Sequence, residues 1–543
     1  MTILRTRGAR RAGRTITLAS AALGLTLTAL ATAAGAATTV PSEFGTDYHD
    51  PVTAAPPISK PHTKSCEVTV AQAQFKDFTP YTGTYTPPTA CGTPGHWSKV
   101  VLRLDGTVAG RQFDRLGYLD IGGVQILRTS TPEPSQDGID WSVEKDVTRY
   151  EKTLSTPRSV DMLIGNVVDD TYTGILDVKA TLTFYAPEPH AAKASAPDQV
   201  IPLSNGNSVT TDAKLTTPRN SERILAEVYA TGSGGGCEEF WYSAVTPSAS
   251  YSCQGGDDGP YREVQVTIDG KLAGIASPYP NIWTGGWSPY LWSVIPSPTA
   301  FDVRPLEFDL TPFAALLNDG KAHTVDVTVA GVPAGQTGWS APTNILVWQD
   351  AHKSVVTGAL TSYKATDPAV TNTYTDGTTR TLDTAGKRRL TVSGYLNTSH
   401  GRVTTTVDRR LSTAITHTWT PDETTDNQQG RWTDDQTVRR GGVTSRTDRT
   451  YTLDGRSTID ADNRLRVIMS FADHAHIDGT RLDDTYTGDA TFTLGVPRDQ
   501  RHAVATTSEH YRLRAPGLRY DRTLGTEQGV LTKDVLTAHP STE

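Results

Sequence analysis

The sequence predicts an all-β protein. Short runs in which apolar and polar residues alternate recur along the chain, and turn residues separate them, as in SKVVLRLDGTVAG (98–110), YLDIGGVQILRTS (118–130) and HTVDVTVAGV (323–332). Alternation with a period of two residues is typical of half-buried strands in an antiparallel sandwich. Only residues 146–154 and 309–320 have the pattern of short helical turns.

The N-terminal part is expected to be an export signal followed by a tail. Residues 5–14 are strongly basic, residues 15–33 are apolar and small, and residues 34–36 (AGA) form an A-x-A cleavage site. This order is typical of a secretory signal peptide, here 1–36, and a membrane anchor is the alternative. Residues 37–63 are rich in Pro, Thr and Ser, so we expect a flexible tail. The mature protein is therefore predicted to be secreted and not membrane-bound.

The chain of 543 residues is long enough for three or four compact units, given about 100 to 200 residues per domain. We predict a first strand-rich domain at 64–187 and a second at 201–350. An Ala/Pro/charged stretch at 188–200 is the expected linker. From 351 to 543 the composition shifts toward Thr, Arg and Asp, which indicates a further C-terminal β domain with possible subdomains.

One short string occurs twice. DDTYTG stands at 169–174 and again at 483–488. No similarity extends around either copy, so we interpret the echo as a shared turn preference or chance and not as a domain repeat.

Charge and missing motifs exclude several classes of function. The net charge is −8 and no dense Lys/Arg patch is interleaved with aromatic residues, so nucleic acid is not an expected partner. The sequence has no G-x-S-x-G, H-E-x-x-H, Walker or dinucleotide-binding motif. His474 and His476 would share a strand face and could ligate a metal, but without a third ligand nearby we expect a solvated strand end. No metal and no cofactor are predicted.

Four cysteines are an even number in a chain with an export signal, so disulfides are expected. We favour Cys66 with Cys91 and Cys237 with Cys253, because each pairing closes a short loop within one predicted domain.

The pentapeptide RQFDR (111–115) places a carboxylate, Asp114, between an aromatic residue and an arginine. In a strand, Phe113 and Arg115 would face one way and Asp114 the other, so Phe113 is expected in the core and Asp114 at the surface. A surface ion pair is the simplest explanation, and a catalytic carboxylate is the alternative.

Residues 234–243 (GGGCEEFWYS) place Glu238 and Glu239 next to three consecutive aromatic residues. The simplest interpretation is a strand edge with one exposed and one capped carboxylate. A binding site held by the expected disulfide of Cys237 is the alternative, in which the aromatic residues, Trp241 among them, support the site.

The segment NIWTGGWSPYLW (281–292) contains Trp283, Trp287 and Trp292 in a Gly/Pro context. Their irregular spacing does not form a core stripe, so we expect the indoles to line a groove, where they would stack on the apolar faces of sugar rings. A structural plug is the alternative. Together with the neighbouring carboxylates, the segment suggests a carbohydrate site.

From about residue 97 to residue 350 the chain closely resembles the A-type peptide N-glycosidases, the peptide-N-(N-acetyl-β-glucosaminyl)asparagine amidases, and residues 511–524 (YRLRAPGLRYDRTL) resemble the closing segment of that family more loosely. The motifs that carry the resemblance, in chain order, are TVAGRQFDR, GGVQILRTSTPEP, WSVEKDVTRY, GNVVDDTYTG, EEFWYS, REVQVTIDGKLAG, IWTGGWSPYLW and FDVRPLEFDLTPF.

The resemblance implies an amidase that releases intact N-linked glycans from glycopeptides or glycoproteins and converts the asparagine to aspartate. A remoter similarity to the F-type enzymes implies two adjacent jelly rolls with the site between them. In that pattern Asp114 matches the principal catalytic aspartate, and Arg115 helps to hold the glycan or to tune that carboxylate. Glu239 matches the second catalytic carboxylate, and Glu238 fills a variable position that we expect to tolerate change.

One position departs from the F-type pattern. The best match to a further active-site glutamate is Asn166, with Asp169 and Asp170 close by, so the third polar residue is open. We include the following as expected substrate-binding residues: Arg115, Asn166, Asp169, Glu238, Trp241, Trp283, Trp287 and Trp292. The alternatives to an amidase are a non-catalytic glycan-binding protein and a glycosidase that cleaves within the glycan core. We expect a monomer.

Overall fold

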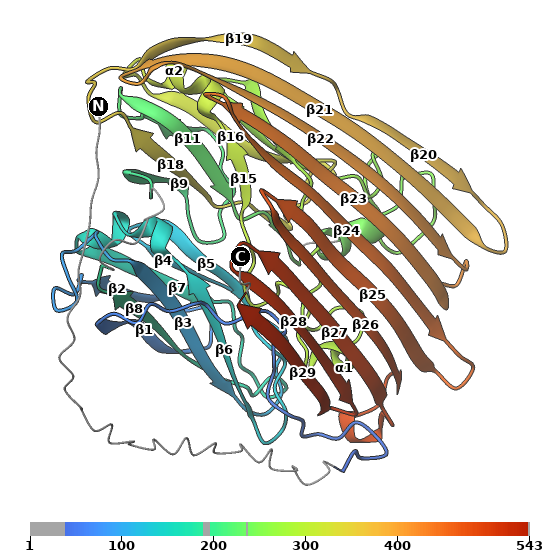
Figure 1. Ribbon diagram of the computed structural model, residues 1–543. Coiled ribbons are helices and arrows are strands. Elements are labelled where there is room, and N and C mark those ends of the chain that lie inside the picture. Colours follow the sequence, from blue (N-terminus) through green and yellow to red (C-terminus); the bar gives the residue numbers. More distant parts are fainter. Residues whose placement is uncertain (1–38, 188–195, 235–236, 541–543) are drawn as a thin grey trace, which may run out of the picture. The chain divides into compact units, whose positions relative to one another are not determined.

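A computed structural model describes residues 39–187, 196–234 and 237–540. Val40–Glu543 forms one compact unit, and the regular structure of its described part is β-strands with only short helical turns (Figure 1). The predicted all-β class is confirmed. The predicted signal peptide, 1–36, lies outside the described residues. Among the described residues no helix has the length and apolar character needed to cross a membrane.

The first strand-rich region forms two four-stranded antiparallel sheets, with the strand orders β1-β8-β3-β6 and β2-β7-β4-β5. Each strand buries alternate residues, as in the pattern BiBeBiBiBB of β8. The strands are β1 (Ser65–Phe75), β2 (Tyr81–Tyr85), β3 (Lys99–Val108), β4 (Leu116–Ile121), β5 (Val124–Ser130), β6 (Ile139–Asp146), β7 (Arg158–Ile164) and β8 (Leu176–Tyr185).

The second strand-rich region also forms two four-stranded sheets, ordered β15-β11-β18-β9 and β10-β16-β13-β14, and β12 pairs with β17. Numbered from one to eight along the chain, its eight sheet strands have the same order as those of the first region. The strands are β9 (Gln199–Ser204), β10 (Ala213–Leu215), β11 (Ser221–Val228), β12 (Thr231–Gly232), β13 (Glu263–Ile268), β14 (Lys271–Ala276), β15 (Leu306–Asp309), β16 (His323–Ala330), β17 (Trp339–Ser340) and β18 (Thr343–Gln349).

Helices are confined to short turns between strands. The two predicted helical stretches are confirmed, and further turns occur in the loops that carry the functional residues. The helices are η1 (Thr148–Tyr150), η2 (Thr153–Ser155), η3 (Glu238–Ser243), α1 (Pro289–Trp292), η4 (Thr311–Phe313), α2 (Ala314–Leu317) and η5 (Arg498–Gln500).

The C-terminal region is one antiparallel sheet in which β19 and β21 to β29 follow one another, with β20 also paired to β21 (Figure 1). The sheet strands are β19 (Thr357–Ala365), β20 (Ala369–Thr375), β21 (Arg380–Thr398), β22 (Gly401–Trp419), β23 (Thr425–Arg440), β24 (Val443–Ile459), β25 (Arg464–Ile477), β26 (Thr480–Thr493), β27 (Val504–Ala515), β28 (Leu518–Glu527) and β29 (Val530–Pro540).

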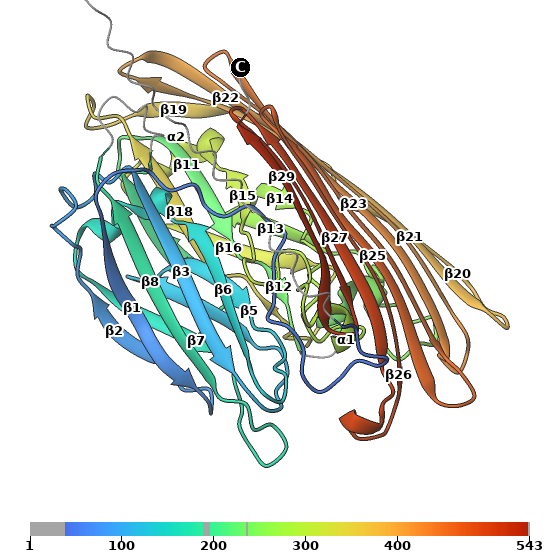
Figure 2. The ribbon, with the colours of Figure 1, turned by 60° about the horizontal axis from the view of Figure 1, so that its bottom comes forward.

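One face of this large sheet is covered by the second region. Trp432 of β23 packs edge-on against Trp241 of η3, with ring centroids 5.6 Å apart, and Tyr486 of β26 donates to the carbonyl of Leu291 in α1. Figure 2 shows α1 against the ends of β26 and β27, in agreement with their contacts. The alternation of buried and exposed residues in the long strands, for example along β21, explains the Thr/Arg/Asp-rich composition, since one face stays in water.

Of the segment expected to be a flexible tail, 37–63, the structure describes residues 39–63, and these pack against the rest of the described protein. Phe44, Tyr48 and Ala54 are buried, the backbone N–H of Phe44 donates to Ala503, and Tyr520 donates to the carbonyl of Ala54. The expectation failed because a few aromatic and small apolar side chains among the prolines are enough to anchor an extended segment to a preformed surface.

The structure bears on three other local expectations, which concern the disulfides, the linker and His474. Disulfides join Cys66 to Cys91 and Cys237 to Cys253, as predicted. Of the expected linker, residues 188–195 lie outside the described residues, and the stretch from Gln199 already belongs to β9. His474 is paired with Asp483 across neighbouring strands, with 3.0 Å between Nδ1 and Oδ1.

Candidate active site

The loop 109–115 between β3 and β4 carries Asp114. It is not a strand, contrary to the expectation, and Phe113 is 46% exposed instead of lying in the core. The buried side chain of Gln112 organises the loop: its amide nitrogen donates to the carbonyls of Val167 (2.8 Å) and Gly174 (3.1 Å). Its amide oxygen accepts from the backbone N–H of Phe113 (3.0 Å) and from Nε of Arg115 (3.1 Å). The RQF portion of the motif therefore fixes the position at which Asp114 projects.

Asp114 meets the second region at Gly285. The backbone N–H of Gly285 donates to the Asp114 carboxylate. A Cβ atom at Gly285 would lie 2.8 Å from Oδ1 of Asp114 and 2.9 Å from Oε1 of Glu133. Only a residue without a side chain lets the loop 281–292 approach both carboxyl groups so closely, so the glycine is part of the site.

Glu133 is the site residue that the sequence analysis missed. It stands between Pro132 and Pro134 directly after β5, and its backbone carbonyl accepts a hydrogen bond of 2.8 Å from the hydroxyl of Tyr48. Two prolines restrict the backbone on both sides, which holds the side chain toward Gly285. An isolated glutamate in a Pro-Glu-Pro sequence at a strand end, inside one of the motifs that carry the resemblance, was the available signal.

Burial and electrostatic repulsion give the carboxyl groups of Asp114 and Glu133 different pKa values. The pKa of Asp114 is raised to about 6, chiefly by burial and further by the charge of Glu239, while the hydrogen bond from Gly285 lowers it. The pKa of Glu133 is raised to about 8, chiefly by burial and then by the charge of Asp114, against the opposing effect of three arginines. Near pH 7 one group is therefore ionised and the other protonated, the arrangement required of a general base and a general acid.

Glu239 lies in the first turn of the short helix η3 (Glu238–Ser243), where a strand edge was expected. The backbone N–H of Gly234 donates to its carboxylate, and burial raises its pKa. Since Glu239 also raises the pKa of Asp114, the two carboxylates are close enough to repel each other. The disulfide of Cys237 holds the start of the helix. Asp114 of the first region and Glu239 of the second region thus interact electrostatically.

Glu238, the residue before it, is fully buried. Its two oxygens accept hydrogen bonds of 3.0 and 2.8 Å from the guanidinium of Arg262, and the indole N–H of Trp339 donates to one of them. The expectation that Glu238 binds substrate and tolerates change does not fit this environment, because both oxygens of its carboxylate are engaged by Arg262 and one also by Trp339.

The tryptophans do not line a groove. Trp241, Trp283 and Trp292 are buried, and the indole N–H groups of Trp283 and Trp292 donate to the backbone carbonyls of Gly232 (3.1 Å) and Gly286 (2.7 Å). Trp287 is partly buried, donates to the hydroxyl of Tyr242 and packs on Gly455 of the large sheet. The structure agrees with the alternative interpretation, a structural plug, because the large apolar area of the indoles is enough to hold a Gly/Pro loop in place.

Asn166 and Asp169 order the neighbouring loop instead of entering the site. Asn166 is fully buried and donates to the carbonyls of Phe75 (2.9 Å) and Gly174 (3.0 Å). The carboxylate of Asp169 accepts the backbone N–H groups of Thr171 and Tyr172, both at 2.7 Å, which holds its pKa below the usual range. The turn places the ring of Tyr172 4.8 Å from that of Phe113, beside Asp114.

A cleft of about 710 Å³ opens beside Glu133 and Gly285. The loop 110–113, Glu133 and Gly285 line it on one side, and residues of the connection between β26 and β27 line it on the other. The C-terminal sheet, for which the sequence suggested no definite role, thus contributes directly to the wall of the candidate active site.

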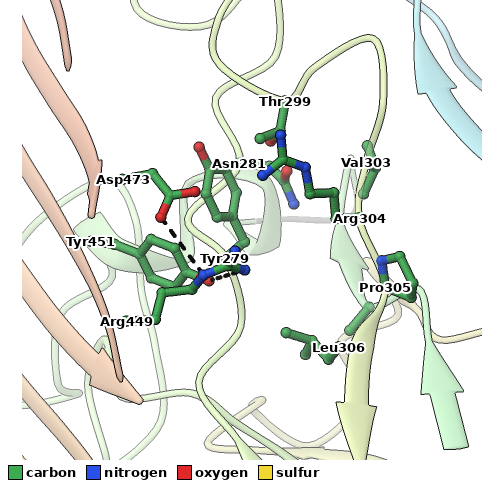
Figure 3. Close-up of a pocket in the computed structure, with 11 residues that line it drawn as sticks. Tyr279, Asn281, Thr299, Val303, Arg304, Pro305, Leu306, Arg449, Tyr451 and Asp473 are labelled. Atoms are coloured by element: carbon green, nitrogen blue, oxygen red, sulfur yellow. Dashed lines mark hydrogen bonds and ion pairs between the residues drawn. The ribbon is translucent and has the colours of Figure 1, made fainter. Parts of the chain in front are cut away.

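A second cavity lies between the second region and the large sheet (Figure 3). It measures only about 20 Å³ and is lined by polar side chains, including Arg449, whose Nε is 3.8 Å from Oδ1 of Asp473 and whose Nη1 donates to the hydroxyl of Tyr451. This volume has room for a water molecule and none for a substrate, so the cavity belongs to the packing between layers.

Comparisons with known proteins identify the family of the chain. Residues 51–366 match the model of the peptide N-acetyl-β-D-glucosaminyl asparaginase amidase A family. A curated relative, peptide-N4-(N-acetyl-β-glucosaminyl)asparagine amidase A of Prunus dulcis, is 32% identical over 382 residues, which are 64% of this chain. The chain spans 66% of the length of that relative, just under two thirds.

Solved structures are related only distantly. The structure described as peptide-N-glycosidase F, a glycosylasparaginase from Flavobacterium meningosepticum, has a TM-score of 0.36 and 12% identity, over 53% of this chain and 96% of that one. A second structure, PNGF-II, has a TM-score of 0.35 and 14% identity, over 52% of this chain and 66% of that one. The family match covers more than half of the chain and contains Asp114, Glu133, Glu239 and Gly285. The chain belongs to the peptide N-acetyl-β-D-glucosaminyl asparaginase amidase A family.

Proposed function

We propose that the protein is an amidase that hydrolyses the bond between an asparagine side chain and the innermost N-acetylglucosamine of an N-linked glycan, on glycosylated peptides or proteins. The observation that carries the proposal is the pair of carboxyl groups at Gly285, Asp114 and Glu133, within the part of the chain that matches the amidase family. The name of the Prunus dulcis relative states the same substrate bond.

Asp114 acts as the general base. An amide is a poor electrophile, so its hydrolysis requires an activated water. The carboxylate of Asp114, ionised above its pKa of about 6, takes a proton from a water that attacks the carbonyl carbon of the asparagine side chain. Gly285 fixes the orientation of the carboxylate by donating its backbone N–H.

Glu133 acts as the general acid. When the carbon–nitrogen bond breaks, the leaving nitrogen must gain a proton, and a carboxyl group with a pKa of about 8 still carries one near pH 7. The step yields an aspartate on the peptide and the glycan as its glycosylamine. Proton exchange with water then returns Asp114 to its ionised form and Glu133 to its protonated form.

Glu239 and Arg115 hold the substrate around this pair. Glu239 reaches the site from the second region and can accept hydrogen bonds from sugar hydroxyl or acetamido groups. The exposed ring of Phe113, tilted against Tyr172 with 4.8 Å between the ring centroids, offers the apolar surface that the sequence analysis assigned to the tryptophans.

The proposal also covers the jelly-roll fold of the two strand-rich regions and the secretion of the protein. We interpret each pair of four-stranded sheets as a jelly roll, and the shared strand order supports this, because a jelly roll winds eight strands as two Greek keys. Secretion of the protein is supported by the signal-like residues 1–36 and by two disulfides.

A mass spectrum of a defined glycopeptide after incubation with the protein tests the function. The proposal predicts a peptide in which aspartate replaces the glycosylated asparagine, together with the intact glycan. A peptide that retains one N-acetylglucosamine would identify a glycosidase that cuts within the core. Bound but unaltered glycopeptide would identify a glycan-binding protein, and either result would contradict the proposal.

A further inference from the structure

Three guanidinium groups line the cleft beside Glu133. Arg111 comes from the Asp114 loop, and Arg498 and Arg501 come from the connection between β26 and β27 of the C-terminal sheet. The family match ends at residue 366, so two of the three lie outside it.

These arginines are held by aromatic rings and not by carboxylates. Arg111 lies over Tyr172 (5.4 Å from Cζ to the ring centroid), Arg498 over Tyr48 (5.4 Å) and Arg501 over Phe492 (5.6 Å). Stacking fixes the plane of a guanidinium while its N–H groups stay available at the edge.

None of the three forms an ion pair with a carboxylate among the residues that the structure describes. Elsewhere in the same sheet, arginines are paired through two N–H groups, as Arg409 with Asp434 and Arg522 with Asp534. Around the cleft the contacts are with neutral groups: Arg498 and Arg501 each donate to one backbone carbonyl at 3.4 Å, and Arg498 also donates to the hydroxyl of Tyr48. The cleft therefore concentrates donors for an anion that the protein does not itself supply.

The net charge of the residues that line the cleft also favours an anion. Its acidic members are Glu133, which burial keeps protonated near pH 7, and Asp499, which is exposed at the rim. Three positive charges thus face at most one negative charge. The planar fork of a guanidinium matches the two oxygens of a carboxylate better than a single-point anion.

We propose that Arg111, Arg498 and Arg501 form a subsite for a carboxylate of the peptide part of the substrate, one that lies close to the glycosylated asparagine. The proposal rests on the amidase function proposed above. The cleft begins at Glu133 and Gly285, beside the reacting amide. A carboxylate on a flanking residue of the peptide reaches it directly, whereas an acidic sugar at the end of a glycan antenna is separated from the amide by the whole core.

Matched glycopeptides test the subsite. Each has blocked termini and the same neutral glycan, and carries either glutamate or glutamine next to the glycosylated asparagine, on its N-terminal or its C-terminal side. We expect kcat/KM to be about tenfold higher for glutamate in one of these positions, which corresponds to about 1.4 kcal/mol of preferential binding. In Arg501→Gln this ratio should fall toward one.

The ratio separates the subsite from other effects. Loss of Arg501 also alters the surroundings of Glu133, but that change would slow both peptides equally and leave the ratio unaltered. Arg519→Gln, which removes the same charge from an exposed position of β28, should keep both the ratio and the activity. Turnover of the glutamine peptides reports the amidase itself, so failure of the proposed function and failure of the subsite are distinguishable.

Two results would overturn the proposal. One is equal kcat/KM for glutamate and glutamine peptides in wild-type protein. The other is a preference that appears only when the neutral glycan is replaced by one ending in sialic acid, because the carboxylate would then belong to the glycan.

Discussion

Asp114 and Glu133 are chemically similar residues that their surroundings separate into a base and an acid. A point next to Gly285 lies within 3 Å of an oxygen of each, so ionisation of one disfavours ionisation of the other. The hydrogen bond from Gly285 reaches Asp114, whereas Glu133 is the more strongly shifted group. The first proton is therefore lost from Asp114, and near neutral pH the pair holds one proton.

The pH dependence of kcat/KM follows from this order. Activity should rise as Asp114 ionises with a pKa of about 6 and fall as Glu133 loses its proton with a pKa of about 8, which gives a bell-shaped profile. In Glu133→Gln the alkaline limb should disappear and the maximum should drop. Initial rates measured between pH 4 and pH 10 check this, and an alkaline limb that persists unchanged in the variant would exclude Glu133 as the acid.

Neutralising Asp114, the proposed base, or Glu239, which holds the substrate, should affect turnover much more than folding. We expect Asp114→Asn and Glu239→Gln each to lower kcat/KM by about 100-fold or more, with thermal unfolding close to that of wild type. Asp105→Asn, which alters an exposed pair with Arg103, is the control and should keep full activity. Near-normal turnover in both active-site variants would refute the assignment.

Glu238 should behave in the opposite way. Glu238→Gln leaves the buried charge of Arg262 without its partner, so we expect a loss of unfolding free energy on the order of 3 kcal/mol. Urea unfolding followed by tryptophan fluorescence measures this. A variant as stable as wild type would show that the sequence-based expectation of tolerance was right after all.

At the scale of elements, the site depends on the loop 281–292, and the tryptophans of this loop hold it in place. The indole N–H groups of Trp283 and Trp292 donate hydrogen bonds to backbone carbonyls, and Trp287 packs on the large sheet. Gly285 can then face the carboxyl groups with its bare backbone. A ring-lined groove and a ring-filled loop have the same composition, which is why the sequence left both alternatives open.

Adding one methyl group at Gly285 tests this arrangement. In Gly285→Ala the new Cβ would lie within 3 Å of both Asp114 and Glu133, so the carboxyl tips must move and kcat/KM should fall on the order of 100-fold. Folding should be retained, since flexible side-chain ends can give way. Gly256→Ala, whose Cβ would first meet Pro333 at 3.9 Å, should be active, and equal rates in the two variants would contradict the geometry.

The string DDTYTG shows that the same six residues can form two different elements. At 169–174 the string forms the turn that Asp169 caps beside the site, and at 483–488 it forms part of β26, with Tyr486 fully buried. Local residues allow both conformations, and long-range packing selects one. For the same reason the strand character of 238–243 and of 111–115 was predicted wrongly, whereas strands with long alternating patterns were predicted well.

At the scale of the whole molecule, the C-terminal sheet completes the core and the cleft. Trp432 packs on Trp241, and Gln428 donates to the carbonyl of Tyr242, both within the helix that begins with Glu238 and Glu239. The sequence indicated a β-rich C-terminal part but neither its single sheet nor its contact with the site, because register and layer packing depend on residues far apart in the chain. Glu133 was missed for a similar reason: its role arises only where two regions meet.

Truncation tests this dependence. Without residues 351–543, Trp241 and neighbouring core residues lose their cover, so we expect the fragment 40–350 to be insoluble or unfolded by circular dichroism. The full-length protein under the same conditions is the control. A soluble fragment with normal amidase activity would show that the C-terminal sheet neither completes the core nor shapes the site.

The central claim is that water attacks the asparagine amide at the Asp114–Glu133 pair. The most direct test is hydrolysis of a glycopeptide in ¹⁸O-labelled water, with the peptide product sequenced by tandem mass spectrometry. We predict aspartate at the former glycosylation site with one heavy oxygen in its side chain, formed by wild-type protein and almost not at all by Asp114→Asn. A released peptide with unlabelled asparagine, or equal labelling by the variant, would contradict the account.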